Sequence, residues 1–168
     1  MKRMLLGIDG GKQGGFVLLN QSGGVVKKWI MPLNDDDNFN PKGIIDIIAE
    51  CFSLSIYGEL IVCLEHAHPR PISGKRACFM NGYGYGLVIG ILHASGIKAF
   101  YIVNPNTWMK EVLGKDRDKK IKGSIQWCKN KYPEESWTAT TRSKKPHTGL
   151  TDACAIAVWG LQQEVMKS

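Results

Sequence analysis

A glycine-rich turn between two apolar runs is the feature that most constrains how this chain begins to fold. The stretch MLLGIDGGKQGGFVLLN, residues 4–20, predicts a buried strand, a tight turn and a second strand. The turn signal QSGG then leads into GVVKKWIMP, residues 24–32, which predicts a third strand and therefore an antiparallel meander. Asp9 follows the first run, and the glycines after it keep the hairpin free of side chains, so that a ligand can approach this carboxylate closely.

The rest of the chain alternates between helical patterns and continuous apolar runs. The run LIVCLE, residues 60–65, predicts a strand covered on both faces in a parallel sheet, and IKAFYIVN, residues 97–104, predicts the fifth strand. Helical spacing or composition predicts helices over residues 41–55, 77–96, 105–114, 118–133 and 149–166. The polar stretch 134–148 is expected to be mobile. This order predicts an α/β fold in which a three-strand antiparallel meander extends parallel strands, with helices flanking the five-stranded mixed sheet.

Length and cysteine pattern limit the class of protein. The 168 residues, 43% of them hydrophobic, are enough for one domain over residues 1–168 with a core of its own. No window approaches the roughly 18 consecutive apolar residues of a membrane span. Five cysteines without a CxxC pair favour neither a disulfide framework nor a structural zinc site, so we expect a cytoplasmic protein with free thiols.

The positive charge is concentrated in one part of the chain. The formal net charge is +7, and residues 115–145 hold ten Lys and Arg against four acids. Clustered cations attract phosphate backbones and release their counterions, so this segment favours a nucleic-acid partner. A solvated lysine-rich surface is the alternative interpretation.

Three acids occupy comparable positions in the predicted topology. Asp9 follows the first strand, Glu65 ends the fourth, and Asp152 stands in the first turn of the last helix. If the two strands are parallel neighbours, ~4.8 Å apart, Asp9 and Glu65 end side by side at the edge where open α/β sheets bind ligands. Carboxylates this close repel unless a cation lies between them, and their oxygens suit Mg²⁺ or Mn²⁺. Alternatively, Glu65 only ends a strand and Asp152 only favours the positive end of a helix.

These residues and their order resemble RuvC-type Holliday-junction resolvases of the RNase H-like superfamily. The similar stretches are LLGIDGG before a hairpin, IVCLE on the fourth strand, lysines after LG, and HTGLTDACAIA opening the last helix. The resemblance spans nearly the whole chain and implies an RNase H-like fold. It further implies that Asp9 bridges two Mg²⁺ or Mn²⁺ ions, that Glu65 supports one of them, and that Asp152 is another ligand. Two ions ~4 Å apart activate a water and stabilise the leaving oxygen of a phosphodiester.

The resemblance extends to further residues and also breaks at one. Lys119 or Lys120, near the start of the basic helix, would hold the scissile phosphate or stabilise transition-state charge. The family often has an acid or a histidine three residues before the final aspartate, where this chain has Gly149. His147 would then serve as the fourth ligand or as a general base, unless it is a plain surface histidine.

A metal-dependent endonuclease that nicks four-way or other branched DNA follows from this resemblance. A junction presents two symmetry-related strands, so we expect a homodimer with two active sites. The aromatic residues Phe79, Tyr83 and Tyr85 would stack on bases or pack in a core or dimer interface. The basic residues expected to bind DNA are Arg70, Lys75, Arg76, Lys115, Arg117, Lys122, Lys144 and Lys145.

Other functions remain open from the sequence. A nuclease of the same fold could act on RNA–DNA hybrids or replication forks instead, and a module of this fold could bind nucleic acid without cutting it. GIDGG before a hairpin also resembles the first phosphate loop of actin-like ATPases, but those proteins need a second domain and a second glycine loop. GKQGG lacks the GxxxxGK[ST] pattern of a P-loop.

Overall fold

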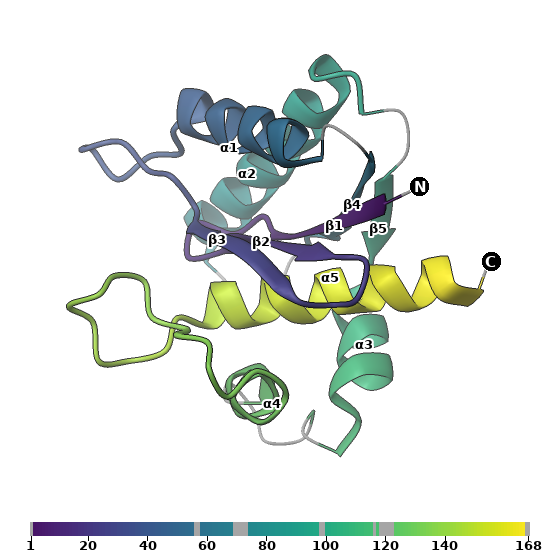
Figure 1. The fold of residues 1–168 in the computed structure, drawn as a ribbon. Helices are drawn as coiled ribbons and strands as arrows, with labels where there is room; N and C mark the ends of the chain where they lie inside the picture. Colours follow the sequence, from purple (N-terminus) through teal and green to yellow (C-terminus); the bar gives the residue numbers. More distant parts are fainter. Residues whose placement is uncertain are drawn as a thin grey trace.

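A mixed five-stranded sheet between two layers of helices is the architecture of the computed structural model (Figure 1). The structure describes residues 2–55, 58–68, 74–97, 100–115, 117 and 123–166. The strand order is β3-β2-β1-β4-β5. The strands are β1 (Lys2–Asp9), β2 (Gly15–Asn20), β3 (Val25–Ile30), β4 (Gly58–Glu65) and β5 (Phe100–Val103). β2 pairs antiparallel with β1 and β3, whereas β1, β4 and β5 run parallel, which confirms the predicted fold class.

The helices divide between the two faces of the sheet. The helical elements are α1 (Pro41–Leu54), α2 (Lys75–Ala94), α3 (Pro105–Trp108), the wider π-type turn η1 (Met109–Leu113), α4 (Gly123–Lys131) and α5 (Thr148–Met166). In Figure 1, α1 and α2 cover one face and α5 the other, with α4 and α3 beneath α5. Within the described residues no helix is long and apolar enough to cross a membrane.

Both faces of β1 are buried, which explains its continuous apolar run. Leu6 and Ile8 lie in a core cluster with residues of α1 and α2, such as Ile44 and Leu92. Leu5, one position along, points to the other side of the sheet and packs with residues of α5. The strand is thus held between two cores, so its carboxyl end is a rigid position for a functional residue.

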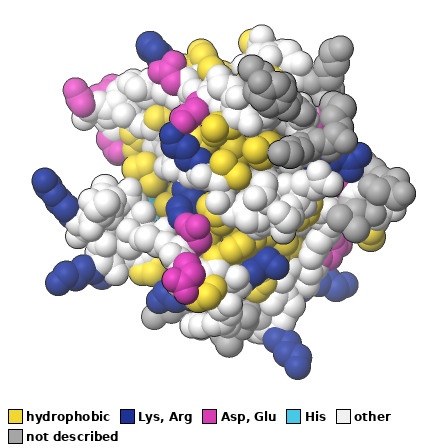
Figure 2. All heavy atoms as spheres, viewed as in Figure 1, with side chains coloured by type: hydrophobic (Ala, Val, Ile, Leu, Met, Phe, Trp, Pro, Cys, Tyr) yellow, Lys and Arg dark blue, Asp and Glu magenta, His cyan; other side chains and the backbone are white. Residues whose placement is uncertain are grey.

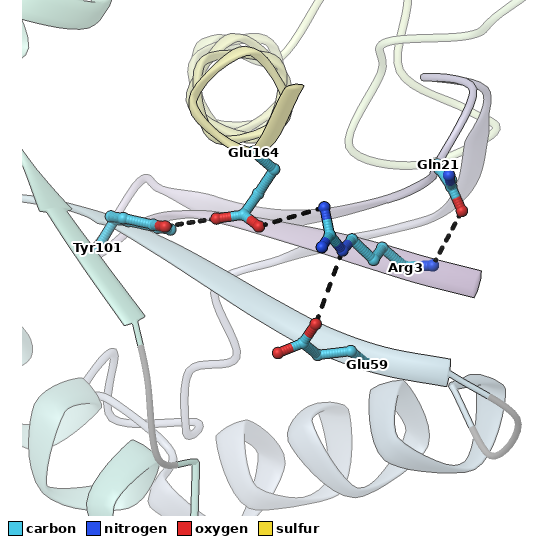
Figure 3. A network of polar contacts seen from close by, with 5 residues as sticks. All are labelled: Arg3, Gln21, Glu59, Tyr101 and Glu164. Carbon is cyan, nitrogen blue, oxygen red and sulfur yellow. Dashed lines mark hydrogen bonds and ion pairs between the residues drawn. The ribbon is translucent and has the colours of Figure 1, made fainter. Parts of the chain in front are cut away.

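The edge of the sheet opposite Asp9 is held by a polar network (Figure 3). Arg3 on β1 lies 3.7 Å from Glu59 of β4 and 3.5 Å from Glu164 near the end of α5. The hydroxyl of Tyr101 on β5 donates to Glu164. Three strands and the last turns of α5 are therefore joined at one edge, and this fixes α5 along the sheet.

Two segments differ from their sequence-based expectation. The predicted helix 105–114 is α3 followed by η1, and it ends as expected at Gly114, whose φ is +53°. The stretch 134–148 is not a free polar segment, because Trp137 within it is only 3% exposed and packs in the core beneath α5. One buried indole is enough to anchor a segment that is otherwise polar. Residues 118–122 of the predicted helix 118–133 lie outside the described residues. α4 covers residues 123–131 and ends two residues earlier than predicted.

Candidate active site

The carboxyl ends of β1 and β4 bring two of the predicted acids to the same place. Ile8 pairs with Leu64 in parallel register, so Asp9 and Glu65 are the next residues on neighbouring strands. The hairpin that follows Asp9 turns back at once, because Gly15, the first residue of β2, pairs with Asp9, the last residue of β1. The predicted side-by-side placement of these two strand ends is therefore present in the structure.

The glycine turn holds the Asp9 carboxylate by its backbone. Gly11 N donates to Asp9 Oδ1 at 3.0 Å, and Gly14 N donates to Gly11 O at 2.8 Å. A Cβ at Gly14 would stand 2.0 Å from Asp9 O, so this position requires glycine. Lys12, at the tip, forms an ion pair with Asp37 of the loop between β3 and α1, a partner that sequence reasoning did not find.

Glu65 is oriented by a tryptophan that the sequence analysis did not single out. Trp108 Nε1, at the end of α3, donates to Glu65 Oε2 at 2.7 Å. The Trp108 side chain is 3% exposed and packs in one cluster with Ala155 and Trp159 of α5. The only signal in the sequence is an aromatic residue shortly after a strand that ends beside Glu65. Trp108 thus links the β4 strand end to α5.

Asp152 is placed by an unusually close approach of α5 to the sheet. A Cβ added at Gly7 of β1 would lie 2.0 Å from Ala153 O, and one at Gly149 would lie 2.2 Å from Gln13 O. Backbone therefore meets backbone on both sides of Asp152. Asp152 precedes Ala155 by three residues and so shares the side of the helix that faces Trp108.

His147 joins this edge of the sheet directly before α5. Its backbone N donates to Trp137 O at 2.7 Å, and its carbonyl oxygen accepts from the N–H groups of Leu150 and Thr151. Burial lowers the pKa of the imidazole, and the negative charge of Asp9 acts in the opposite direction. The Nδ1 atom is buried and finds no hydrogen-bond partner among the residues that the structure describes. The imidazole is thus largely neutral near pH 7 and near enough to Asp9 to interact with it electrostatically.

The donor types at this edge fit a divalent metal, although the side chains do not form a closed metal site. Among the described residues, no three His, Cys, Asp or Glu side chains are grouped closely enough to hold an ion. Carboxylates on two strand ends and one helix, with a neutral imidazole beside Asp9, are the ligand types of Mg²⁺ and Mn²⁺ sites. The orphaned Nδ1 of His147 is a donor atom of the right kind for such a ligand set.

A second polar group lies next to Glu65. His66 Nδ1 is 3.3 Å from His68 Nε2, which is 2.8 Å from Asn104 Oδ1 at the end of β5. The His66 ring also meets Tyr85 of α2 edge to face. The stacked pair Phe79 and Tyr83, by contrast, is exposed on α2. Of the three aromatic residues weighed from the sequence, Tyr85 alone packs against a histidine at the strand ends.

The predicted DNA-binding residues are spread over several elements. Lys75 and Arg76 are exposed in the first turn of α2, Lys115 and Arg117 are exposed after η1, and Lys144 and Lys145 are exposed in the segment before α5. Lys119 and Lys120, predicted to contact the phosphate, lie outside the described residues, as do Arg70 and Lys122.

Comparison with known proteins identifies the fold. No protein-family model and no curated protein matches the sequence. Among solved structures, Thermus thermophilus RuvC in complex with Holliday junction substrate matches with a TM-score of 0.56 at 15% identity, over 98% of this chain and 96% of that chain. A second structure of Thermus thermophilus RuvC matches with a TM-score of 0.57 at 17% identity, over 99% and 97%. The chain therefore has the RuvC-like, RNase H-like fold over nearly its whole length.

Proposed function

We propose that this protein is a metal-dependent endonuclease that nicks four-way or other branched DNA. The proposal is supported by the neighbouring strand ends that carry Asp9 and Glu65 in a RuvC-like sheet, by the electrostatic effect of Asp9 on His147, and by the close packing of the helix that carries Asp152. That edge is where open α/β sheets place their ligands. The Thermus structure with a Holliday junction substrate supports branched DNA as the substrate class.

Each residue has a distinct part in this proposal. Asp9, Glu65 and Asp152 would hold one or two Mg²⁺ or Mn²⁺ ions, which supply an activated water and stabilise the leaving oxygen of the phosphodiester. Trp108 keeps one oxygen of Glu65 in place. His147 either completes the ligand set or accepts a proton from the attacking water, since its lowered pKa keeps it neutral. Lys119 or Lys120 would contact the scissile phosphate.

The proposal includes a homodimer, because a four-way junction presents two strands related by a two-fold axis. Two active sites of one dimer would then nick the two strands symmetrically. Light scattering should give twice the 18.7 kDa mass of one chain. A mass of one chain at the concentrations that cut junctions would contradict this part of the proposal.

The decisive experiment measures cutting and binding together. Labelled four-way junctions, RNA–DNA hybrids and linear duplexes are incubated with the wild-type protein, Asp9→Asn and Asp152→Asn in Mg²⁺ or Mn²⁺. We expect the wild type to nick the junction, and both variants to bind it without cutting. Asp46→Asn on α1 is the matched control, because it changes an exposed carboxylate that is not a candidate site residue and that pairs with Lys42.

Two outcomes would change the proposal. Undiminished cutting by both active-site variants would exclude the assigned carboxylates. Cutting of hybrids with junctions left intact would keep the nuclease and change its substrate.

A further inference from the structure

The segment between Trp137 and His147 forms a loop that is closed at its base, rather than an open connection between two helices. We call residues 138–146, TATTRSKKP, the basic loop. An isolated antiparallel bridge joins Thr138 to Pro146 at its base. Inside it, Ser143 N donates to Thr140 O at 3.1 Å and Ser143 Oγ donates to Lys145 O at 3.3 Å. The loop therefore has a defined shape of its own.

A buried anchor holds the base of the basic loop on the body of the protein. Trp137 packs in the core beneath α5, with the Tyr132 ring 6.0 Å away. Lys28 of β3 lies over the Trp137 ring at 4.9 Å and forms an ion pair with Glu135. The Tyr132 hydroxyl donates to Gly23 O at 2.9 Å. Contacts to both β3 and the turn before it thus fix where the loop leaves the surface.

The charge on the basic loop has one sign. Arg142, Lys144 and Lys145 are exposed, and the sequence from 136 to 147 contains no acid. Within the part of the chain that the structure describes, the ion pairs leave these three cations out. Figure 2 shows Lys and Arg side chains standing out from the surface on the side where Figure 1 places this loop.

The basic loop is also tied directly to the candidate active site. His147 N donates to Trp137 O at 2.7 Å, so the loop begins and ends at one backbone hydrogen bond. The residue that closes it is the histidine beside Asp9. In Figure 1 the loop projects next to the first turn of α5, at the end of the sheet where β1 stops.

We propose that the basic loop is a preformed clamp for the sugar–phosphate backbone of the DNA strand beside the bond that is cut. This inference rests on the proposed function and assigns it a specific surface. Three unpaired cations on a shaped loop suit the regularly spaced phosphates of a strand, and each contact releases counterions. Because the loop is already shaped and anchored, binding orders little new structure.

The test measures binding without metal, so that it does not depend on cutting. Anisotropy of a labelled four-way junction in EDTA is measured over a series of salt concentrations for the wild type and for K144A/K145A. We expect weaker binding of the variant and a salt slope, log Kd against log [salt], that is shallower by about two. In Mg²⁺ the same variant should raise KM with kcat close to the wild-type value, since these lysines contact the backbone away from the reacting bond.

K27A/K42A is the matched control, because it removes two lysines that already have ion-pair partners. Lys27 on β3 pairs with Glu50, and Lys42 on α1 pairs with Asp46. Its salt slope should stay close to that of the wild type. An unchanged slope in K144A/K145A, or an equal loss in both double variants, would overturn the clamp. Failure of cutting by the wild type would instead contradict the proposed function, and the binding result in EDTA would still decide the clamp.

Discussion

At the scale of single residues, Glu65 depends on a hydrogen bond that carries no charge of its own. Trp108 Nε1 donates to one carboxylate oxygen at 2.7 Å from within the core. In the proposed metal site, a group that orients a ligand in this way would contribute to metal affinity and activity without touching the metal. The position of Glu65 is therefore set partly by α3, outside the strand that bears it.

Trp108→Phe removes the donor and keeps an aromatic ring in the same cluster. We expect kcat/KM for junction cutting to fall about 10- to 100-fold, with a larger Mg²⁺ requirement, because Glu65 loses its orienting partner. Trp159→Phe is the matched control, since its Nε1 also donates at 2.7 Å to a carboxylate, that of Glu111. Equal losses of activity in the two variants would show that packing, and not the hydrogen bond to Glu65, is responsible.

The lowered pKa of His147 predicts how the stability of the protein depends on pH. Burial holds the pKa of its imidazole below the ordinary value of 6.5, so the unfolded chain binds more protons just below that pH. The contribution of the neutral imidazole to the free energy of unfolding should be complete above about pH 6.5. It should be lost progressively as the pH drops toward the folded-state pKa of His147. Urea titrations in EDTA between pH 7.5 and about 5 measure this slope.

His147→Gln should flatten that part of the profile, because glutamine does not titrate. His93→Gln at the end of α2 controls for the loss of an imidazole elsewhere. A His147→Gln profile with the full wild-type slope would mean that other groups cause the pH dependence.

At the scale of elements, the contact between α5 and β1 is made by backbone and small side chains. The virtual Cβ of Gly7 would stand 2.0 Å from Ala153 O and 2.5 Å from Ala157 N. Neither of these backbone atoms can move without shifting the helix. Any side chain at this contact therefore changes the distance between Asp9 and Asp152 as well as the packing.

Gly7→Ala should destabilise the protein by about 1–3 kcal/mol or more and reduce junction cutting, because overpacking displaces α5 from the sheet. Gly86→Ala on α2 is the control, because its Cβ would meet nothing within 4 Å and alanine favours a helix by about 0.5–1 kcal/mol. Chemical denaturation measures both. A stable, active Gly7→Ala protein would show that α5 has room to adjust.

The main elements were predictable from hydrophobic runs and turn residues, since each strand is a short apolar segment bounded by glycine or polar residues. The wide turn η1 was not, because Met109–Leu113 carries an ordinary helical pattern. The fold of residues 134–148 was not predictable either, because it depends on one tryptophan finding a place beneath α5. Local sequence does not encode such long-range burial.

At the scale of the whole molecule, packing on both faces of the sheet protects most of the thiols. Cys51, Cys63, Cys128 and Cys154 are fully buried, whereas Cys78 near the start of α2 is partly exposed. Burial raises the pKa of Cys51 and of Cys63 to about 12. Thiolate formation and reagent access are thus both suppressed at these buried positions.

A thiol reagent at pH 7.5 should therefore label Cys78 first, and the four buried thiols only when the protein unfolds. Mass spectrometry of the modified protein over time gives the number and order of labelled sites. Cys78→Ser should remove the fast phase. Rapid labelling of several thiols in the native protein would contradict the two-sided core.

The positions of the candidate acids followed from topology, because strand ends and helix starts can be located from the sequence. Asp9 and Glu65 were placed side by side once two apolar runs were taken as parallel neighbours, and the register agrees. That these acids bind metal stays a prediction. Trp108 and the anchor Trp137 were missed, because an indole N–H or ring shows no partner until distant elements are packed.

The packing of α5 against β1 also has a consequence for protein synthesis. β1 is synthesised well before the helix that carries Asp152, because that helix begins only at Thr148. A chain interrupted before residue 147 has Asp9 and Glu65 but lacks the cover over one face of β1 and β2. If the protein is the proposed nuclease, we expect such a truncated product to be inert toward DNA, because it lacks one of the three candidate carboxylates as well as the helix that packs against the sheet.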